Sequence, residues 1–180
     1  MEQGLAKQGV ILETSRLRLR EFIPADVDAL EGILGDPVAM QYYPAPFDRA
    51  EIESWVRRNR ARYVHSGFGL WAMLPKHSDE LIGDCGCFVR DFEGDFEFEI
   101  AWHVRRDLWG RGYATEAAQS CLEYAFSSLG TERVIALVRP ENLSSCRVAE
   151  KIGMKCERVI FWRGYDHCIY VRHNDGRHNN

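Results

Sequence analysis

The chain has 180 residues, of which 46% are hydrophobic and 28% charged, and its formal net charge is −4. These values indicate one soluble globular domain with a full core, and the slightly acidic balance argues against a dedicated nucleic-acid binder. No apolar run reaches the roughly 18 residues of a membrane span, and the N-terminus lacks a secretory layout, so we expect a cytoplasmic protein.

The first half of the chain predicts a strand, two helices and three antiparallel strands. Alternating apolar residues predict the first strand at 16–22, and Pro24 begins the first helix. Asp48 and Glu51 form a capping-box pattern for a second helix that reaches residue 63. We interpret its arginines as a solvated face, although they could also meet an acidic ligand. The antiparallel strands are expected at 68–74, 80–90 and 95–104.

The second half predicts a long helix at 113–129 and a strand at 133–139, which the crossover makes parallel to 95–104. A short helix from residue 144 or 145 to 152 follows. Two last strands are expected at 155–162 and 167–172. The sequence therefore predicts a single α/β (α+β) domain with a mixed, mostly antiparallel sheet of about seven strands and about four helices.

Six cysteines are present, none in the C-x-x-C spacing of a zinc or redox site. We interpret them as reduced structural thiols and expect no metal. They are Cys85, Cys87, Cys121, Cys146, Cys156 and Cys168.

The segment WHVRRDLWGRGYATEAA, residues 102–118, predicts an anion site. Gly110 and Gly112 let backbone N–H groups approach an anion closely, and the helix that follows points its free N–H groups at the same place. Three arginines add positive charge nearby, namely Arg105, Arg106 and Arg111. We expect a phosphate or pyrophosphate here.

Two common nucleotide motifs fit this turn poorly. A P-loop requires a lysine that does not follow Gly112, and a dinucleotide fingerprint requires a third glycine where Thr115 stands. The preceding strand also lies in an antiparallel run rather than in a βαβ unit. A glycine-containing turn without a ligand stays open as an alternative.

The strand at 95–104 carries candidate bases. Its period of two places Glu97, Glu99, Ala101 and His103 on one face, with the two glutamates about 7 Å apart. Proximity and partial burial of two carboxyl groups are expected to raise at least one pKa. His103 has the pKa of a base, but we interpret it as a packed strand residue that acts through its backbone.

Three segments in this order resemble the GNAT superfamily of acyl-CoA-dependent N-acyltransferases: ETSRLRLREFIPAD, EIAWHV with LWGRGYATEA, and ENLSSCRVAEKIGM. They are most similar to its ribosomal-protein N-terminal acetyltransferases (RimJ/RimL-like). The resemblance implies a GNAT-type fold with the parallel pair at the cofactor cleft. It divides the chain into an N-terminal extension (1–11), an acetyltransferase domain (12–173) and a disordered tail (174–180).

The resemblance also implies acetyl-CoA as co-substrate. The implied pyrophosphate binders are Trp109, Gly110, Arg111, Gly112, Tyr113 and Ala114. Trp109 stands where glutamine or arginine is usual. His103 and Val104 are implied to bind the pantetheine arm through their backbone and to stabilise the oxyanion. Asn142 and Ser145 are implied to lie at the pantetheine or the amine, and both also suit helix capping.

The implied reaction is acetyl transfer to a primary amine, such as a protein N-terminus, by direct attack in a ternary complex. Glu99 is the implied base, with Glu97 as the alternative. The family's usual acid, a tyrosine, is replaced by Ala149, so Ser145 or a water is left for that role. We expect an amine acceptor as partner, no direct nucleic-acid or membrane partner, and leave a homodimer open.

Three alternatives stay open at this point. The first is a non-catalytic acyl-CoA-binding or regulatory module, which the missing tyrosine would explain. The second is an acetyltransferase of a small-molecule amine. The third is a different nucleotide-dependent enzyme.

Overall fold

An eight-stranded sheet forms the centre of the computed structural model, which describes residues 9–92 and 94–176. The strand order is β1-β2-β3-β4-β5-β6-β8-β7, and all neighbours are antiparallel except β5 and β6. The strands are β1 (Val10–Glu13), β2 (Leu17–Arg20), β3 (Leu70–Pro75), β4 (Gly83–Phe92), β5 (Asp95–Val104), β6 (Arg133–Val138), β7 (Lys155–Trp162) and β8 (Tyr165–His173).

This sheet confirms the predicted fold class and the parallel pair. β1 is the strand that the sequence did not predict, and it begins inside the segment predicted as an N-terminal extension. Residues 1–8 of that extension and 177–180 of the predicted tail lie outside the described residues.

The helices are α1 (Val27–Leu34), α2 (Arg49–Ser66), α3 (Tyr113–Ser127) and α4 (Leu143–Lys151), with 3-10 turns at Pro24–Asp26 and Arg106–Leu108. α2 begins at the predicted capping box, in which the backbone N–H of Glu51 donates to Asp48 Oδ1 at 2.8 Å and the N–H of Asp48 donates to Glu51 Oε2 at 2.8 Å. No helix in the described part of the chain is long and apolar enough to cross a membrane.

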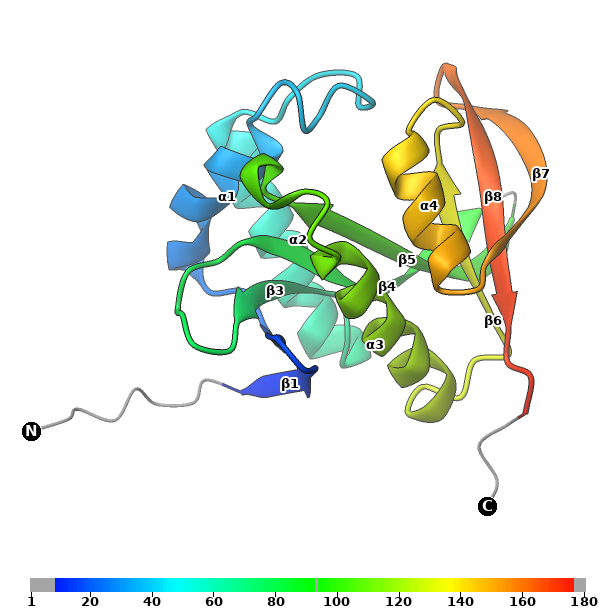
Figure 1. The fold of residues 1–180 in the computed structure, drawn as a ribbon, viewed down its shortest axis with the longest axis horizontal. Coiled ribbons are helices and arrows are strands. Elements are labelled where there is room, and N and C mark those ends of the chain that lie inside the picture. Colours follow the sequence, from blue (N-terminus) through cyan, green and yellow to red (C-terminus); the bar gives the residue numbers. More distant parts are fainter. Residues whose placement is uncertain (1–8, 93, 177–180) are drawn as a thin grey trace, which may run out of the picture.

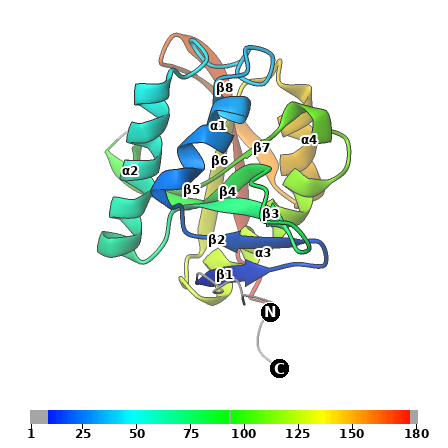
Figure 2. The same cartoon turned by 90° about the vertical axis from the view of Figure 1, so that its left-hand side faces the viewer.

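The helices cover the two faces of the sheet in pairs, α1 with α2 and α3 with α4 (Figures 1 and 2). Alternate residues of β3 show this arrangement. The backbone N–H of Leu70 donates to Asn59 of α2 at 3.1 Å, while Trp71 on the other face packs edge-on against Tyr124 of α3. Below, the two sides are called the α2 face and the α3 face.

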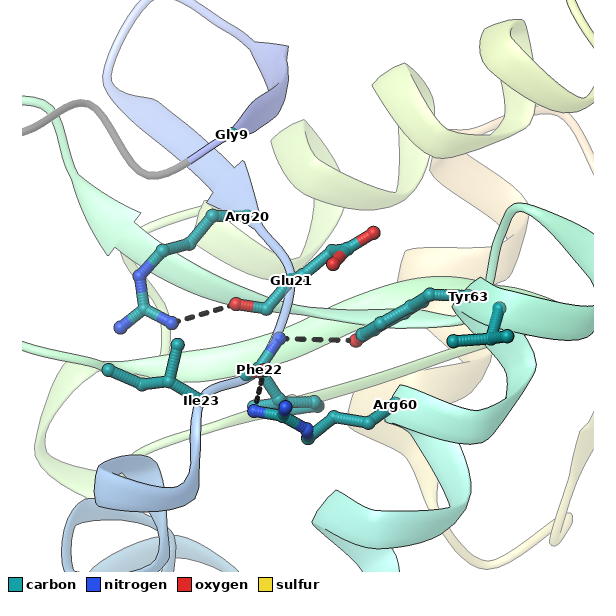
Figure 3. A pocket seen from close by; sticks show the side chains of 8 residues that line it. Gly9, Arg20, Glu21, Phe22, Ile23, Arg60 and Tyr63 are labelled. Carbon is teal, nitrogen blue, oxygen red and sulfur yellow. Dashed lines mark hydrogen bonds between the residues drawn. The ribbon is translucent and has the colours of Figure 1, made fainter.

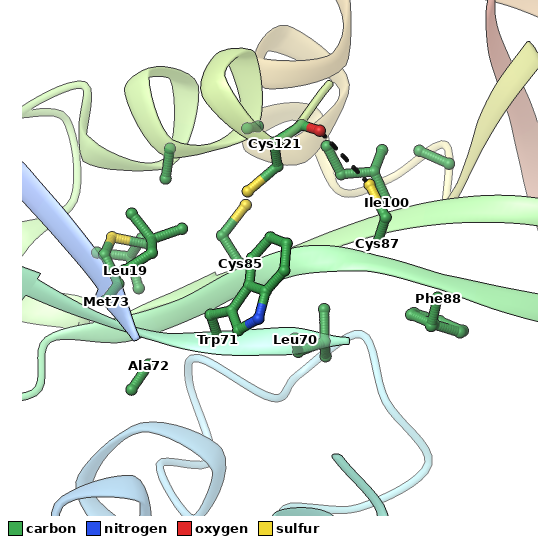
Figure 4. Close-up of a cluster of buried hydrophobic side chains, with 14 of the residues drawn as sticks. Leu19, Leu70, Trp71, Ala72, Met73, Cys85, Cys87, Phe88, Ile100 and Cys121 are labelled. Atoms are coloured by element: carbon green, nitrogen blue, oxygen red, sulfur yellow. Dashed lines mark hydrogen bonds between the residues drawn. The ribbon is translucent and has the colours of Figure 1, made fainter. Parts of the chain in front are cut away.

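The cysteines lie mainly in the core, as the prediction of structural thiols requires. Cys85, Cys87 and Cys121 pack between the sheet and α3 beside Trp71 (Figure 4). All six thiols are free, and Cys156 alone is exposed. The small side chains of α3 allow this close packing, because a helix with buried alanines can approach a sheet closely.

The parallel strands β5 and β6 separate soon after they meet. Their pairing consists of Glu99 with Ile135, although β5 continues for five more residues to Val104. Backbone groups that leave a sheet in this way need other partners. The end of β5 leads through a short connector to the predicted anion site, so this divergence positions the candidate site.

Candidate active site

The glycine turn has the backbone that an anion cradle needs. Gly110 and Gly112 have φ angles of 76° and 81°, a region that side chains with a Cβ rarely adopt. α3 starts at the next residue, Tyr113. Among the described residues, no side chain accepts from the first N–H groups of α3, so they and the helix dipole are available to an anion. These features fit a pyrophosphate.

The arginines beside this turn contribute less charge than the sequence predicted. Arg105 is paired with Glu80 and with Asp107, and Arg106 lies 3.2 Å from Asp36. These carboxylates therefore offset the positive charges of Arg105 and Arg106. Arg111 is exposed, and its guanidinium reaches only the backbone carbonyl of Asp107, at 3.5 Å. The positive field at the turn thus comes from Arg111 and the helix.

A clamp that sequence reasoning missed fixes the first turn of α3. Glu116 accepts hydrogen bonds from the hydroxyls of Thr14 (2.6 Å) and Ser15 (2.9 Å) and from the backbone N–H of Arg16 (2.8 Å). The guanidinium of Arg16 pairs with Glu116 at 2.6 Å and also donates to the carbonyl of Arg111 at 3.0 Å. The segment from Thr14 to Arg16 therefore holds the turn in place.

The charge state of Glu116 follows from these contacts. Burial alone would raise its pKa, but the hydrogen bonds from Thr14 and Arg16 outweigh burial and lower the pKa to about 2. Glu116 is therefore a carboxylate at every physiological pH.

Trp109 connects the turn to the end of β5. Its indole N–H donates to the carbonyl of Val104 at 2.7 Å, and its ring is 43% exposed. This tryptophan braces the strand end while leaving anion contacts to the backbone. The binding of pantetheine by the backbone of His103 and Val104 stays a prediction.

A buried hydrogen-bonded chain connects β4, β5 and the loop between α1 and α2. Asp84 Oδ1 lies 2.7 Å from His103 Nδ1, and His103 Nε2 lies 2.7 Å from the hydroxyl of Tyr43. The indole of Trp55 donates to the second oxygen of Asp84 at 3.1 Å. Asp84 is fully buried, whereas Tyr43 is 38% exposed, so the chain runs from the interior to the surface.

This network adds side-chain contacts to His103, whose predicted role through its backbone stays a prediction. Burial would lower the pKa of its imidazole, but Tyr43 and Asp84 outweigh burial and raise the pKa to about 10. This shift favours the imidazolium form of His103, in which both ring nitrogens donate. No local sequence pattern indicates this network, because its members lie 19 and 60 positions apart.

Glu99 lies on the α2 face of β5, buried and paired with Arg90 of β4. The second bond of this bidentate pair joins Arg90 Nη2 to Glu99 Oε1 at 3.2 Å. Burial raises the pKa of Glu99 in spite of the opposing arginine. The pKa of Glu99 is raised, as predicted, but burial is the main cause and a neighbouring glutamate is not among the causes.

Glu97 has different surroundings. It pairs with Arg133 at 2.9 Å and lines a small polar hollow of about 120 Å³ next to Asp95. The two glutamates share a face, as predicted, yet each has its own arginine, so they do not form a coupled carboxyl pair.

The predicted residues of α4 divide between capping and packing. Asn142 Oδ1 accepts from the backbone N–H of Ser145 at 3.2 Å and from the hydroxyl of Ser144 at 2.9 Å, so Asn142 caps the helix. Ser145 is half-buried at this first turn. Ala149 is completely buried, and no proton donor replaces the usual tyrosine at that position.

A larger hollow than the one beside Glu97 lies elsewhere. A cavity of about 430 Å³ opens between the end of β2 and α2, lined by Arg20, Phe22, Arg60 and Tyr63 among others (Figure 3). The N–H of Phe22 donates to the Tyr63 hydroxyl at 3.4 Å, and Arg20 is engaged by Asp26. Volume therefore does not identify the site, whereas backbone geometry and chemistry do.

Comparisons with known proteins agree with this geometry. Residues 16–155 match the model of an acetyltransferase (GNAT) domain. The uncharacterised protein YkkB of Bacillus subtilis is 38% identical over 150 residues, which cover 83% of this chain and 87% of YkkB. A GNAT-family acetyltransferase from Bacillus anthracis superposes with a TM-score of 0.76 at 28% identity, over 90% of this chain and 97% of that one. RimL, a ribosomal L7/L12 α-N-protein acetyltransferase solved with coenzyme A, superposes with a TM-score of 0.70 at 17% identity. The superposition covers 93% of this chain and 99% of the RimL chain.

Proposed function

The chain belongs to the GNAT family of acetyltransferases, and from this premise we propose that it transfers the acetyl group of acetyl-CoA to a primary amine by direct attack in a ternary complex. The acceptor is a protein N-terminal amine or a small-molecule amine. The RimL structure, solved with coenzyme A and named for a protein acceptor, supports the first of these through its fold alone.

One observation carries the proposal: the divergence of β5 and β6 leads directly to the turn at Gly110 and Gly112. The open edge of β5 can bind an extended pantetheine arm as an added strand would bind. The N–H groups at the start of α3 suit the pyrophosphate, and Asn142 and Ser145 lie beyond β6 at the other wall. The bound thioester supplies the acetyl group.

Acetyl transfer requires a neutral amine, and Glu99 is our candidate for the base that takes the proton, directly or through a water. Its raised pKa brings it closer to that of a useful base, and its buried position on the α2 face favours proton transfer over exchange with solvent. Glu97 is the alternative. Backbone N–H groups at the end of β5 are the proposed oxyanion donors.

The leaving sulfur requires a proton, and Tyr43 is our candidate for the donor in place of the absent tyrosine. Because His103 is an imidazolium, its Nε2–H donates to the Tyr43 oxygen, which leaves the phenolic proton free to point outward. When that proton is given to the sulfur, His103 stabilises the phenolate, and solvent then restores the proton. Ser145 is the second candidate for this role.

A second function, a non-catalytic acyl-CoA-binding module, is favoured by one observation, the buried Ala149 at the position of the usual acid. Such a module would keep the glycine turn and bind acetyl-CoA without turnover.

The test combines binding with turnover. Calorimetry of the full chain with acetyl-CoA, ATP and NAD checks the cofactor, and release of the free coenzyme A thiol with a panel of peptides, amino acids, aminoglycosides and polyamines checks the reaction. We expect acetyl-CoA to bind most tightly and at least one amine to release thiol. Acetyl-CoA binding without release by any amine would favour the binding module, and tighter binding of ATP or NAD would contradict both functions.

A further inference from the structure

Three arginines from separate elements gather on the α2 face around Glu99. Arg62 of α2 lies 4.5 Å from the ring centre of Phe88, and Arg90 of β4 lies 5.3 Å from the same ring. Arg90 is also 4.9 Å from the ring of Trp162, over which Arg163 of the β7–β8 turn lies at 4.5 Å. Guanidinium groups and aromatic rings thus alternate along this surface. We call Arg62, Arg90 and Arg163 the arginine wall.

The wall carries more positive charge than its surroundings neutralise. Glu99 is the carboxylate within it, and Arg90 occupies both of its oxygens. In the described part of the chain, Arg62 donates only to the amide oxygen of Asn59, at 3.0 Å, and Arg163 has no carboxylate within ion-pair distance. Three guanidinium groups and one carboxylate leave an excess of two positive charges.

This excess is costly at Arg62 and Arg90, which are half-buried, whereas Arg163 is exposed. Burial, together with the neighbouring Arg58 and Arg90, lowers the pKa of the Arg62 guanidinium from its ordinary value. Like charges held together away from water destabilise a fold unless something offsets them. A ligand with a negative group would offset them, and paired guanidinium forks suit carboxylate and phosphate oxygens.

The position of the wall gives it a role in choosing the acceptor. Glu99 sits among the three arginines and shares the α2 face of β5 with His103, which holds Tyr43. An amine bound at Glu99 would therefore lie close to Arg62 and Arg163.

We propose that the acceptor is an amine that also carries a carboxylate or a phosphate, and that Arg62 and Arg163 bind this anionic group while the amine lies at Glu99. The inference rests on the proposed function and names its substrate class. The anionic group can belong to a small amino acid or phosphoamine, or to an acidic residue near a peptide N-terminus. Polycations such as aminoglycosides and polyamines meet repulsion at the same surface.

Matched acceptor pairs test the proposal. Initial rates of thiol release are compared for O-phosphoethanolamine against ethanolamine, for glycine against glycinamide, and for peptides with glutamate against glutamine at the second position. We expect kcat/KM to favour the anionic member of at least one pair by roughly tenfold, the factor of one charge-assisted hydrogen bond, and added salt to reduce the preference. The pair that responds identifies whether the anion belongs to a small molecule or a peptide.

Variants assign the preference to the wall. Arg62→Gln and Arg163→Gln should each reduce the kcat/KM preference for the anionic acceptor severalfold, mainly through KM. Arg62→Lys should retain most of this preference. Arg57→Gln, on an exposed position of the same helix, is the matched control and should leave it unchanged. Equal or better use of neutral or cationic amines by the wild type would overturn the proposal while leaving the acetyltransferase function intact.

Binding measurements test the proposed anion preference even if no amine releases thiol. Calorimetry with O-phosphoethanolamine and glycine, and with ethanolamine and glycinamide, which lack the anionic group, is performed on protein saturated with coenzyme A. Tighter binding of the anionic members, lost in Arg62→Gln, would support the proposal even if the acetyltransferase function fails. The absence of any anionic preference would contradict it.

Discussion

The cofactor side and the acceptor side of this site are built in different ways. The proposed cofactor side is a contiguous turn at 109–114, which offers backbone N–H groups and two glycines at positive φ. The acceptor side collects side chains from the loop after α1, from α2, from β4 and β5, and from the β7–β8 turn.

This difference shows how a common cofactor and a variable acceptor can share one fold. A backbone cradle depends on few side chains, so we expect it to tolerate Trp109 in place of glutamine or arginine. A face made of side chains on separate elements can change its charge by single substitutions without disturbing the sheet. Variants on the acceptor side should therefore change kcat or acceptor preference, and variants on the cofactor side should change acetyl-CoA affinity or stability.

The largest effect is expected from Glu99→Gln, which keeps the shape but removes the base. We expect kcat, measured with the best acceptor of the panel, to fall roughly 100-fold or more, the usual contribution of a general base. The base acts when ionised, so wild-type kcat should rise as pH increases through the raised pKa of Glu99, and the variant should lack this rise. Acetyl-CoA affinity by calorimetry should stay unchanged.

Glu97→Gln is the matched control on the same strand and face, because Glu97 pairs with Arg133 rather than with Arg90. A larger loss of kcat in Glu97→Gln than in Glu99→Gln would make Glu97 the candidate base in place of Glu99. Unchanged kcat across pH in both variants would remove the carboxylates from the mechanism.

The next largest effect is expected from Tyr43→Phe, which removes the terminal hydroxyl of the chain from Asp84. We expect kcat to fall roughly tenfold to 100-fold, as for a lost general acid, with acetyl-CoA affinity retained. The imidazolium of His103 exists below its pKa of about 10, so wild-type kcat should decline as pH rises through that value, and the variant should not show this decline.

Tyr42→Phe changes the adjacent tyrosine, which contacts Arg139 through its backbone carbonyl, and should behave as the wild type. Equal losses in the two variants would indicate a general disturbance of the loop, and no loss in Tyr43→Phe would leave Ser145 as the candidate acid.

On the cofactor side, Gly112→Val should weaken acetyl-CoA binding roughly tenfold, since a β-branched residue at positive φ costs about 1–3 kcal/mol and distorts the cradle. Calorimetry measures the change. Gly130→Val is the control, because Gly130 has a φ of +67° away from the turn and open space around its Cα. It should lose comparable stability and keep its affinity for acetyl-CoA. Equal affinity in the two variants would contradict the role of the cradle.

The smallest effect is expected from Glu116→Gln, which should destabilise the fold by about 1–3 kcal/mol because charge-assisted bonds to Thr14, Ser15 and Arg16 are weakened. The folded pKa of about 2 lies below that of an unfolded glutamate. Wild-type stability should therefore be complete above about pH 4.3 and decline as pH falls toward 2.

Urea unfolding from neutral pH down to about pH 3 measures this dependence. The variant should lose less stability over that interval, and Glu123→Gln, on an exposed turn of the same helix, should keep the wild-type slope. Identical slopes in all three proteins would show that the clamp does not stabilise the turn.

Local patterns predicted much of the architecture. The capping box of Asp48 and Glu51, the α3 helix after Gly112 and the parallel pair all appear where the chain indicated. The arginines were harder to interpret. Arg57, Arg58 and Arg60 are exposed as expected for a solvated helix face, but Arg62 packs against Phe88, because helix rotation and strand register decide which residues meet.

By itself the sequence determined the elements and the glycine turn before α3, since both depend on neighbouring residues: hydrophobic period, capping and glycine at positive φ. Only the tertiary structure decided the charges and contacts of the site. The Glu116 clamp joins residues 102 positions apart, and the Tyr43–His103–Asp84 chain joins a loop to two strands. Burial and partners from distant segments set the pKa values of these groups, and no local pattern encodes them.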